Sequence, residues 1–416
     1  MKRKPAIALI VVVAVMLVAA LALRWAMRPQ TLGPRVLDMA GQALGLEISA
    51  DEFDYRLRGG PRLVARGVSA RTPGAQAAMM EAERVMVAVP WSTLRARGAD
   101  PVVTRIELDA PRVQFEPLMR WWSQRPRGDG PLATLREGLG VDRGRIDGGD
   151  WSLRDIAIDL PRFAPDERLA GGVRGRYQAA TMQVPFDLRV AMTRPGAGAG
   201  IGAAGTAVPR ADGWRVPSRV VFSTRLGADT GMPLRLHGLR LSSGSRYVSA
   251  ETTQHFALGV AGEGTFADGV LELEPAAIAL RGQDMIPRLR GRGRLALGQP
   301  LEFALGGRID HWPEAWPALP PPVGDSDSPL PFQLDYSGPA NLSDPVELRL
   351  ARDGTRFEGR LRVAEVTGWI GDLDAGSPLP PLDGRVTVPR MEVAGASLHG
   401  VEITIEDDPA DEAGKP

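Results

Sequence analysis

Apolar and polar residues alternate along most of the chain, and the clearest example lies between residues 184 and 192. The apolar side chains there occupy every second position, at Val184, Phe186, Leu188, Val190 and Met192. Asp187 and Arg189 lie between them. Similar alternation recurs at 234–236, 271–273, 301–305, 346–350 and 401–405. A period of two with one apolar face is typical of half-buried antiparallel strands, so residues 141–406 are predicted to form an extended antiparallel sheet.

A short helix and several strands are predicted before this sheet. Pro34 suits the first turn of a helix, and apolar residues follow it at helical spacing as far as Leu44. Strands are expected over 48–57, 62–68, 83–89, 104–108 and 112–115, with the first two joined at Gly59-Gly60. The polar, glycine- and proline-rich stretch 121–140 predicts a linker, in which a short helix from Pro131 to Leu139 is left open.

The segment from Ala6 to Leu23 contains no charged residue and no proline. An α-helix of this length, at 1.5 Å per residue, spans about 27 Å, close to the hydrocarbon thickness of a bilayer. Lys2, Arg3 and Lys4 precede the segment, and a short basic N-terminal flank usually stays in the cytoplasm. Residues 1–30 are therefore predicted to form a single-pass membrane anchor, with the C-terminal bulk of the chain outside the cytoplasm.

A cleaved signal peptide is the alternative to this anchor. Ala20-Leu21-Ala22 has the small-x-small form of a processing site. The apolar run is longer than a usual signal sequence, and the large Trp25 follows at once, so the uncleaved anchor is favoured.

Four segments carry a resemblance to a known family. They are LEISADEFDYRL at 46–57, AERVMVAVPWSTLRARGADPVVTRIELDAPRVQF at 82–115, RIDGGDWSLRDIAIDLP at 145–161 and LDGRVTVPRMEVAGASLHGVEITIED at 382–407. Following an anchor and a short helix, this pattern of strands and turns resembles the AsmA-like family of Gram-negative bacteria. The resemblance covers residues 30–116 well and later residues in patches. It implies an inner-membrane protein whose bulk is periplasmic, with a role in lipid transport or outer-membrane homeostasis.

The resemblance and the patterning together give a domain scheme. Residues 1–30 are expected to be the anchor, 31–120 an AsmA-type helix and β module, 121–140 the linker and 141–406 an extended β-groove. Residues 407–416 are acidic and are expected to be disordered. The predicted fold class is mainly β, an N-terminal transmembrane helix followed by an elongated, curved, taco-like antiparallel sheet with few short helices.

The predicted sheet has more apolar surface than the few expected helices can cover, and a sheet must bury its apolar face against something. One solution is a closed sandwich or barrel. The other, which the resemblance favours, is a groove that holds lipid acyl chains, since each buried CH₂ contributes about 0.8 kcal/mol. The residues expected to line this groove are Val184, Phe186, Leu188, Val190, Leu301, Phe303, Leu305, Leu348 and Ile403.

The expected partners are therefore the inner membrane, through Ala6 to Leu23, and a phospholipid or other lipid. An alternative function, without lipid carriage, is an envelope-assembly or secretion component that docks a protein partner through the open edges of the sheet.

Composition removes several other classes of function. The 416 residues include 50 basic and 50 acidic side chains, a formal net charge of +0, so no bulk charge favours nucleic acid. The absence of cysteine excludes disulfides, thiol catalysis and cysteine-ligated metals.

The remaining candidates for chemistry are weak. His237, His255, His311 and His399 are scattered without metal-ligand spacing. Gly200 to Gly205 matches a dinucleotide fingerprint in letters, but no helix pattern follows it, and a flexible hairpin tip is expected instead. No catalytic residue, metal site or cofactor is predicted, and the protein is not expected to be an enzyme.

Overall fold

The computed structural model describes residues 41, 44–56, 60–95, 102–124, 134–179, 181–228, 233–250, 252–267, 269–283, 286–314, 316, 319, 323–326, 328–371, 381–393 and 396–406. The predicted anchor, most of the predicted helix over 34–44 and the acidic tail over 407–416 lie outside these residues. No helix among the described residues is long and apolar enough to cross a membrane.

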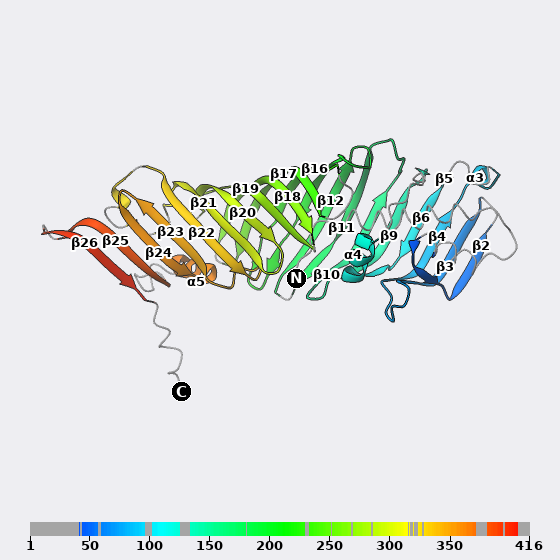
Figure 1. Cartoon of the computed structure of the whole chain (residues 1–416), viewed down its shortest axis with the longest axis horizontal. Helices are drawn as coiled ribbons and strands as arrows, with labels where there is room; N and C mark the ends of the chain where they lie inside the picture. The colour runs from blue at the N-terminus through cyan, green and yellow to red at the C-terminus, as the bar shows by residue number, and fades with distance from the viewer. Residues whose placement is uncertain are drawn as a thin grey trace, which may run out of the picture. The chain divides into compact units, whose positions relative to one another are not determined.

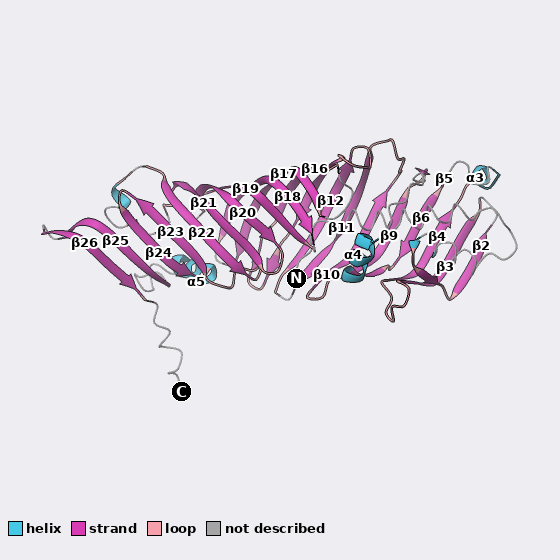
Figure 2. Cartoon of the chain, in the orientation of Figure 1, coloured by secondary structure: helices cyan, strands magenta, loops and turns pink. Residues whose placement is uncertain are grey.

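The chain divides into two units, each mainly β (Figure 2). The N-terminal unit comprises Arg3–Gly238 with Phe266–Gly269, and the C-terminal unit comprises Leu239–Thr265 and Val270–Pro416. The prediction of a mainly β chain with few short helices is confirmed for the part of the chain that the structure describes.

The described residues of the N-terminal unit include strands β1 to β16 and the helices α3 and α4 (Figure 1). The strands are β1 (Glu47–Ser49), β2 (Glu52–Arg56), β3 (Arg62–Arg71), β4 (Met80–Ala88), β5 (Val102–Val103), β6 (Arg105–Asp109), β7 (Arg112–Gln114), β8 (Thr134–Leu135), β9 (Leu139–Asp147), β10 (Trp151–Leu160), β11 (Leu169–Ala179), β12 (Gln183–Met192), β13 (Gly200–Ala207), β14 (Arg210–Ala211), β15 (Trp214–Arg215) and β16 (Ser218–Leu226). The helices are α3 (Trp91–Arg95) and α4 (Phe115–Gln124).

The prediction of a purely antiparallel sheet is wrong at β9. The order β2–β3–β4–β6 is antiparallel, but both β6 and β7 pair with β9 in parallel. Parallel neighbours need a crossover connection, which is usually a helix, and α4 lies in the sequence between β7 and β9. From β9 the pairing is antiparallel through β10, β11, β12, β13 and β16.

Helix α4 extends as far as Gln124, into the first residues of the predicted linker over 121–140. Phe115, Leu118 and Trp121 recur at helical spacing and are buried, and Trp121 Nε1 donates a hydrogen bond of 2.9 Å to the carbonyl oxygen of Leu44. The alternative of a short helix from Pro131 to Leu139 is wrong, because β8 forms at Thr134–Leu135 and β9 begins at Leu139.

The largest core lies in the N-terminal unit, where α4 packs on the sheet. Phe115 contacts Trp151 edge to face with ring centroids 5.3 Å apart, and Trp151 stacks on Tyr177 at 6.1 Å. Ile106, Leu139 and Ile146 are among the fully buried side chains of this core.

The glycine-rich segment from Gly200 to Gly205 is a strand, not the expected hairpin tip. It forms β13, which pairs with β12 on one side and β16 on the other. A Cβ added at Gly205 would overlap the carbonyl oxygen of Asp187, so glycine permits a close backbone approach here.

The C-terminal unit contains most of β17 (Leu234–Ser249) and the later strands. These are β18 (Thr253–Ala267), β19 (Val270–Gly282), β20 (Arg288–Leu297), β21 (Leu301–His311), β22 (Leu330–Gly338), β23 (Val346–Arg352), β24 (Thr355–Leu361), β25 (Leu382–Val393) and β26 (Ala396–Ile405). From β19 to β26 each strand pairs antiparallel with the next one in sequence. The described residues of this unit also include a short helix η1 (Val323–Asp325) and the unpredicted α5 (Val363–Gly371).

Candidate functional site

The four predicted groove residues of the N-terminal unit lie together on one face of β12. Val184, Phe186, Leu188 and Val190 are half-buried, whereas Asp187 and Arg189 are exposed on the opposite face. The register places Tyr177 and Val173 of β11 beside Val184 and Leu188. On the other side, Ala207, Gly205 and Ala203 of β13 lie opposite Phe186, Leu188 and Val190.

Strand β16 extends this apolar face. Val220 and Phe222 pair with Gly205 and Ala203 and are half-buried, while the intervening Val221 is 55% exposed on the other side of the strand. We call the half-buried surface of β11, β12, β13 and β16 the N-terminal apolar face. It comprises Val173, Val184, Phe186, Leu188, Val190, Ala203, Val220 and Phe222.

Protein side chains cover one end of the N-terminal apolar face. Tyr177 is 8% exposed and belongs to the core beneath α4, and Val184 and Phe186 pack against that core. Gly175 lies opposite Phe186 in the register, and a Cβ there would lie 3.0 Å from Phe186 Cζ. The absence of a side chain at Gly175 therefore makes room for the Phe186 ring.

The other five predicted residues share one face of the C-terminal unit. Phe303 pairs with Leu295 and Tyr336, and its ring stacks on Tyr336 with centroids 5.3 Å apart. Leu301 lies on the same face of β21, two residues before Phe303. Leu305 and Leu348 both pair with Leu334 of β22.

Ile403 belongs to a second row of the same face. Through Val386, Phe357 and Leu350, the register connects Ile403 to Phe332. Exposure varies along the surface, since Leu305 is 9% exposed and Ile403 is 41% exposed. We call this surface the C-terminal apolar face, comprising Leu295, Leu301, Phe303, Leu305, Leu334, Leu348, Leu350, Phe357, Val386 and Ile403.

The opposite, polar surface of each unit is held by cross-strand ion pairs. In the C-terminal unit, Asp310 accepts hydrogen bonds from Arg290 at 2.8 Å and Arg308 at 3.0 Å. The hydrogen bond from Arg290 is the main cause that lowers the pKa of Asp310.

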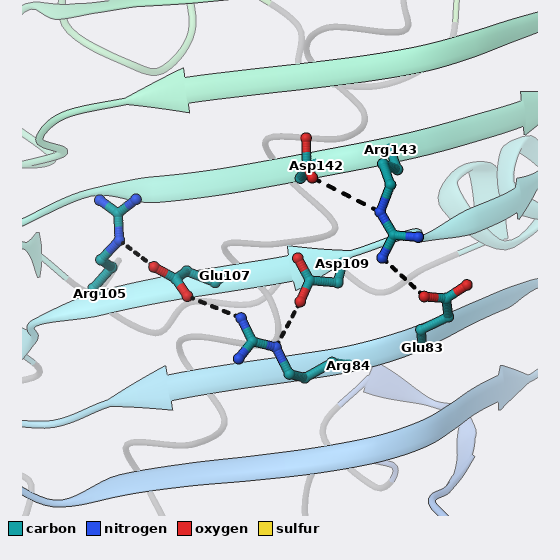
Figure 3. Close-up of polar contacts among 7 residues, drawn as sticks. All are labelled: Glu83, Arg84, Arg105, Glu107, Asp109, Asp142 and Arg143. Atoms are coloured by element: carbon teal, nitrogen blue, oxygen red, sulfur yellow. Dashed lines mark hydrogen bonds and ion pairs between the residues drawn. The ribbon is translucent and has the colours of Figure 1, made fainter.

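Figure 3 shows the same arrangement in the N-terminal unit. Arg84 contacts Asp109 at 2.6 Å and Glu107 at 3.4 Å, and Arg105 contacts Glu107 at 2.8 Å. Charged side chains of these strands are thus satisfied within the protein.

The side chains of the two apolar faces, in contrast, are only partly covered by protein. A closed sandwich packs the inner faces of two sheets together to native density, which would bury the inward side chains. Of the nine predicted residues only Leu305 is buried; seven are half-buried and Ile403 is exposed. Each face, taken by itself, therefore offers apolar surface on which a ligand without charge could gain free energy by burial.

Sequence reasoning missed the contributions of β11 and β16 to the N-terminal apolar face. Val220 and Phe222 lie two positions apart, as on one face of a strand, but the residue between them is the apolar Val221, so no alternation of apolar and polar residues is visible. The arrangement of Tyr177 and Val173 depends on the pairing of β11 with β12, which no local pattern reports.

The candidate chemical groups do not assemble into a site. His237, His255, His311 and His399 are each exposed. No group of three His, Asp or Glu side chains able to hold a metal ion occurs within the described ranges. The expectation that the protein is not an enzyme stays a prediction.

Comparison with known proteins gives no match: no protein-family model, no curated protein and no solved structure is similar to the chain. The likeness to the AsmA-like family consequently stays a prediction from the sequence.

Proposed function

We propose that the chain is an inner-membrane-anchored periplasmic protein that binds lipid acyl chains and contributes to lipid transport or outer-membrane homeostasis, as its resemblance to the AsmA-like family implies. The observation that carries the proposal is the half-buried state of the two apolar faces. The proposal includes the predicted taco-like groove.

The energetic argument needs no specific polar site. Each methylene group that leaves water contributes about 0.8 kcal/mol, and the N-terminal apolar face presents branched and aromatic side chains on neighbouring strands. Acyl chains are flexible and apolar, so they adapt to a surface of this kind. The bound lipid then replaces the second protein layer that a sandwich would have.

The direct test is to purify the full chain in a mild detergent, extract it and identify bound lipids by mass spectrometry. We expect phospholipid or another acyl lipid in a fixed ratio to protein. A preparation that is folded and free of lipid, and that takes up none from added vesicles, contradicts the proposal.

Adjacent positions on β16 provide a matched pair of variants. Val220→Asp introduces a carboxylate on the N-terminal apolar face, whereas Val221→Asp introduces the same group at a position that is 55% exposed on the other side. We expect Val220→Asp to reduce the lipid recovered per mole of protein severalfold, because a buried charge is costly, and Val221→Asp to leave it unchanged. Equal lipid recovery from both variants would argue against this face as the binding surface.

A second candidate, an envelope-assembly protein without lipid carriage, is favoured by the last strand. Among the described residues β26 pairs with β25 alone, and it exposes Leu398 to 45% and Ile403 to 41%. An unpaired strand edge is a template for strand addition by a partner. Crosslinking from Leu398 that captures one protein in stoichiometric amounts, from a preparation without lipid, would favour this candidate over lipid carriage.

A further inference from the structure

The polar surface of the N-terminal unit contains a hollow of about 520 Å³ across β2, β3, β4 and β6. Five arginines and three carboxylates line it. Three of these arginines are paired within the protein: Arg84 and Arg105 with the carboxylates drawn in Figure 3, and Arg66 with Glu52 at 3.5 Å. Arg56 and Arg62 are the two that remain.

The strand register explains why Arg56 and Arg62 differ from the others, because it sorts the side chains into rows. One row runs Glu52, Arg66, Arg84 and Asp109, with an acid at each end. The next runs Asp54, Val64, Met86 and Glu107, again with an acid at each end. The third runs Arg56, Arg62, Ala88 and Arg105 and contains no acid.

Arg56 and Arg62 are direct cross-strand partners in this third row. Like charges directly opposite each other destabilise an antiparallel pair. Among the described residues Arg62 forms no ion pair, and Arg56 has only a contact of 3.7 Å with Asp54, its neighbour on the same strand. Both arginines are exposed, so an anion from outside the protein can reach them.

The floor and rim of the hollow suit a ligand with an organic part. Met86 and Ala88 are buried and form an apolar floor, and the small side chain of Ala88 follows Arg62 in the row. Trp91 lines the hollow and is 45% exposed. Guanidinium groups bind phosphate through paired hydrogen bonds, and an indole ring provides surface for the group that the phosphate carries.

We propose that this arginine hollow is a binding site for a phosphate ester, with the phosphate held between Arg56 and Arg62. The phosphate neutralises the opposed guanidinium groups, and its organic substituent lies toward Trp91. The ester is either the anionic headgroup of a lipid or a small soluble phosphate. The site lies on the polar surface of its unit, opposite in strand parity to the N-terminal apolar face, so it does not depend on the proposed acyl-chain binding.

The test uses the full chain in a neutral detergent and three probes: inorganic phosphate, phosphatidylglycerol, and phosphatidylcholine with the same acyl chains. Binding is followed by calorimetry and by the change in Tm. We expect phosphatidylglycerol to bind more tightly than phosphatidylcholine, since only the former has a net negative headgroup. Stabilisation by inorganic phosphate as well identifies a soluble phosphate as a sufficient ligand, and stabilisation by phosphatidylglycerol alone identifies a lipid headgroup.

The variant Arg56→Gln/Arg62→Gln should weaken the response to the anionic probe by about tenfold or more. Its Tm without ligand should equal or exceed that of the wild type, because the opposed charges are removed. The control Arg189→Gln removes an exposed arginine on β12 outside the hollow and should bind like the wild type. Arg62→Lys keeps the charge but not the fork of donors, and should retain weaker binding.

Three results would overturn the inference. They are anion binding that survives the double substitution, equal loss of binding in Arg189→Gln, and a lower ligand-free Tm in the double variant. The last result would assign the arginines a structural role. Acyl lipids recovered from the purified chain would be unaffected by any of these results, so this inference and the proposed function can fail separately.

Discussion

Tyr177 marks the point in the N-terminal unit where protein stops covering the apolar side of the sheet. It stacks on Trp151, which in turn contacts Phe115 of α4, and the next strand carries the half-buried Val184 opposite it. Burial, with a smaller contribution from the nearby charge of Asp150, raises the pKa of Tyr177 to about 12. The phenol is therefore held in its neutral form by the same packing that closes the core.

This pKa predicts a loss of stability at high pH. The unfolded-state pKa of tyrosine is about 10, so the unfolded chain loses the proton first as pH rises from about 10 to about 12, and the free energy of unfolding falls over that window. In Tyr177→Phe this contribution should be absent. Denaturant unfolding below and within the window, with and without the substitution, measures it; an identical pH dependence in both proteins would contradict it.

Helix α4 is the element that makes the first part of the sheet a closed core. Its buried side chains cover the apolar side of the first strands. The apolar side of the later strands β12 and β16 is only half-buried. The helix also provides the connection between β7 and the parallel β9. One element thus sets both the topology and the extent of the covered surface.

Two adjacent tryptophans test the contribution of α4. Trp121 is buried and donates to Leu44, whereas Trp122 is half-buried. We expect Trp121→Ala to lower the free energy of unfolding of the N-terminal unit by about 3–5 kcal/mol and Trp122→Ala to cost clearly less. Denaturant unfolding of the full chain, followed by the loss of near-ultraviolet signal, gives the comparison. Equal costs would mean that the hydrogen bond and burial of Trp121 add little.

Sequence patterning predicted the positions of the strands better than it predicted which strands pair with each other. The alternation at 184–192 and 301–305 correctly predicts β12 and β21, because a period of two is a local property of a strand. The parallel pairing of β9 was not predictable in the same way, since it depends on where α4 returns the chain. Gly200 to Gly205 has too few side chains to show alternation, and α5 gave no sequence signal that separated it from the surrounding strands.

For the whole chain, sequence patterning predicted which strand faces are apolar but not the arginine hollow. All nine predicted residues lie on the two apolar faces, where local alternation is informative. The hollow depends on Arg56 meeting Arg62, and on Ala88 following in register. A shift of two residues between β2 and β3 would have placed Asp54 opposite Arg62, so the opposed pair of arginines could not be predicted before the register was known.

Acyl-chain binding predicts that lipid stabilises the chain. A ligand that binds only the folded state raises stability by RT ln(1 + [L]/Kd). Chain stripped of lipid in detergent should therefore show a lower Tm, and phosphatidylcholine should restore it in a concentration-dependent way. The restoration should be smaller in Val220→Asp than in Val221→Asp. A Tm that is insensitive to lipid in all three proteins would contradict the acyl-chain hypothesis.

The nearest-neighbour pairing of the C-terminal unit has an evolutionary consequence. Because each strand from β20 to β25 bonds to the strands immediately before and after it in sequence, a duplicated hairpin inserts beside its parent without breaking any distant contact. Gene duplication or deletion can then lengthen or shorten this unit two strands at a time. Relatives of this protein are expected to differ in size by whole hairpins, with insertions in multiples of a strand pair.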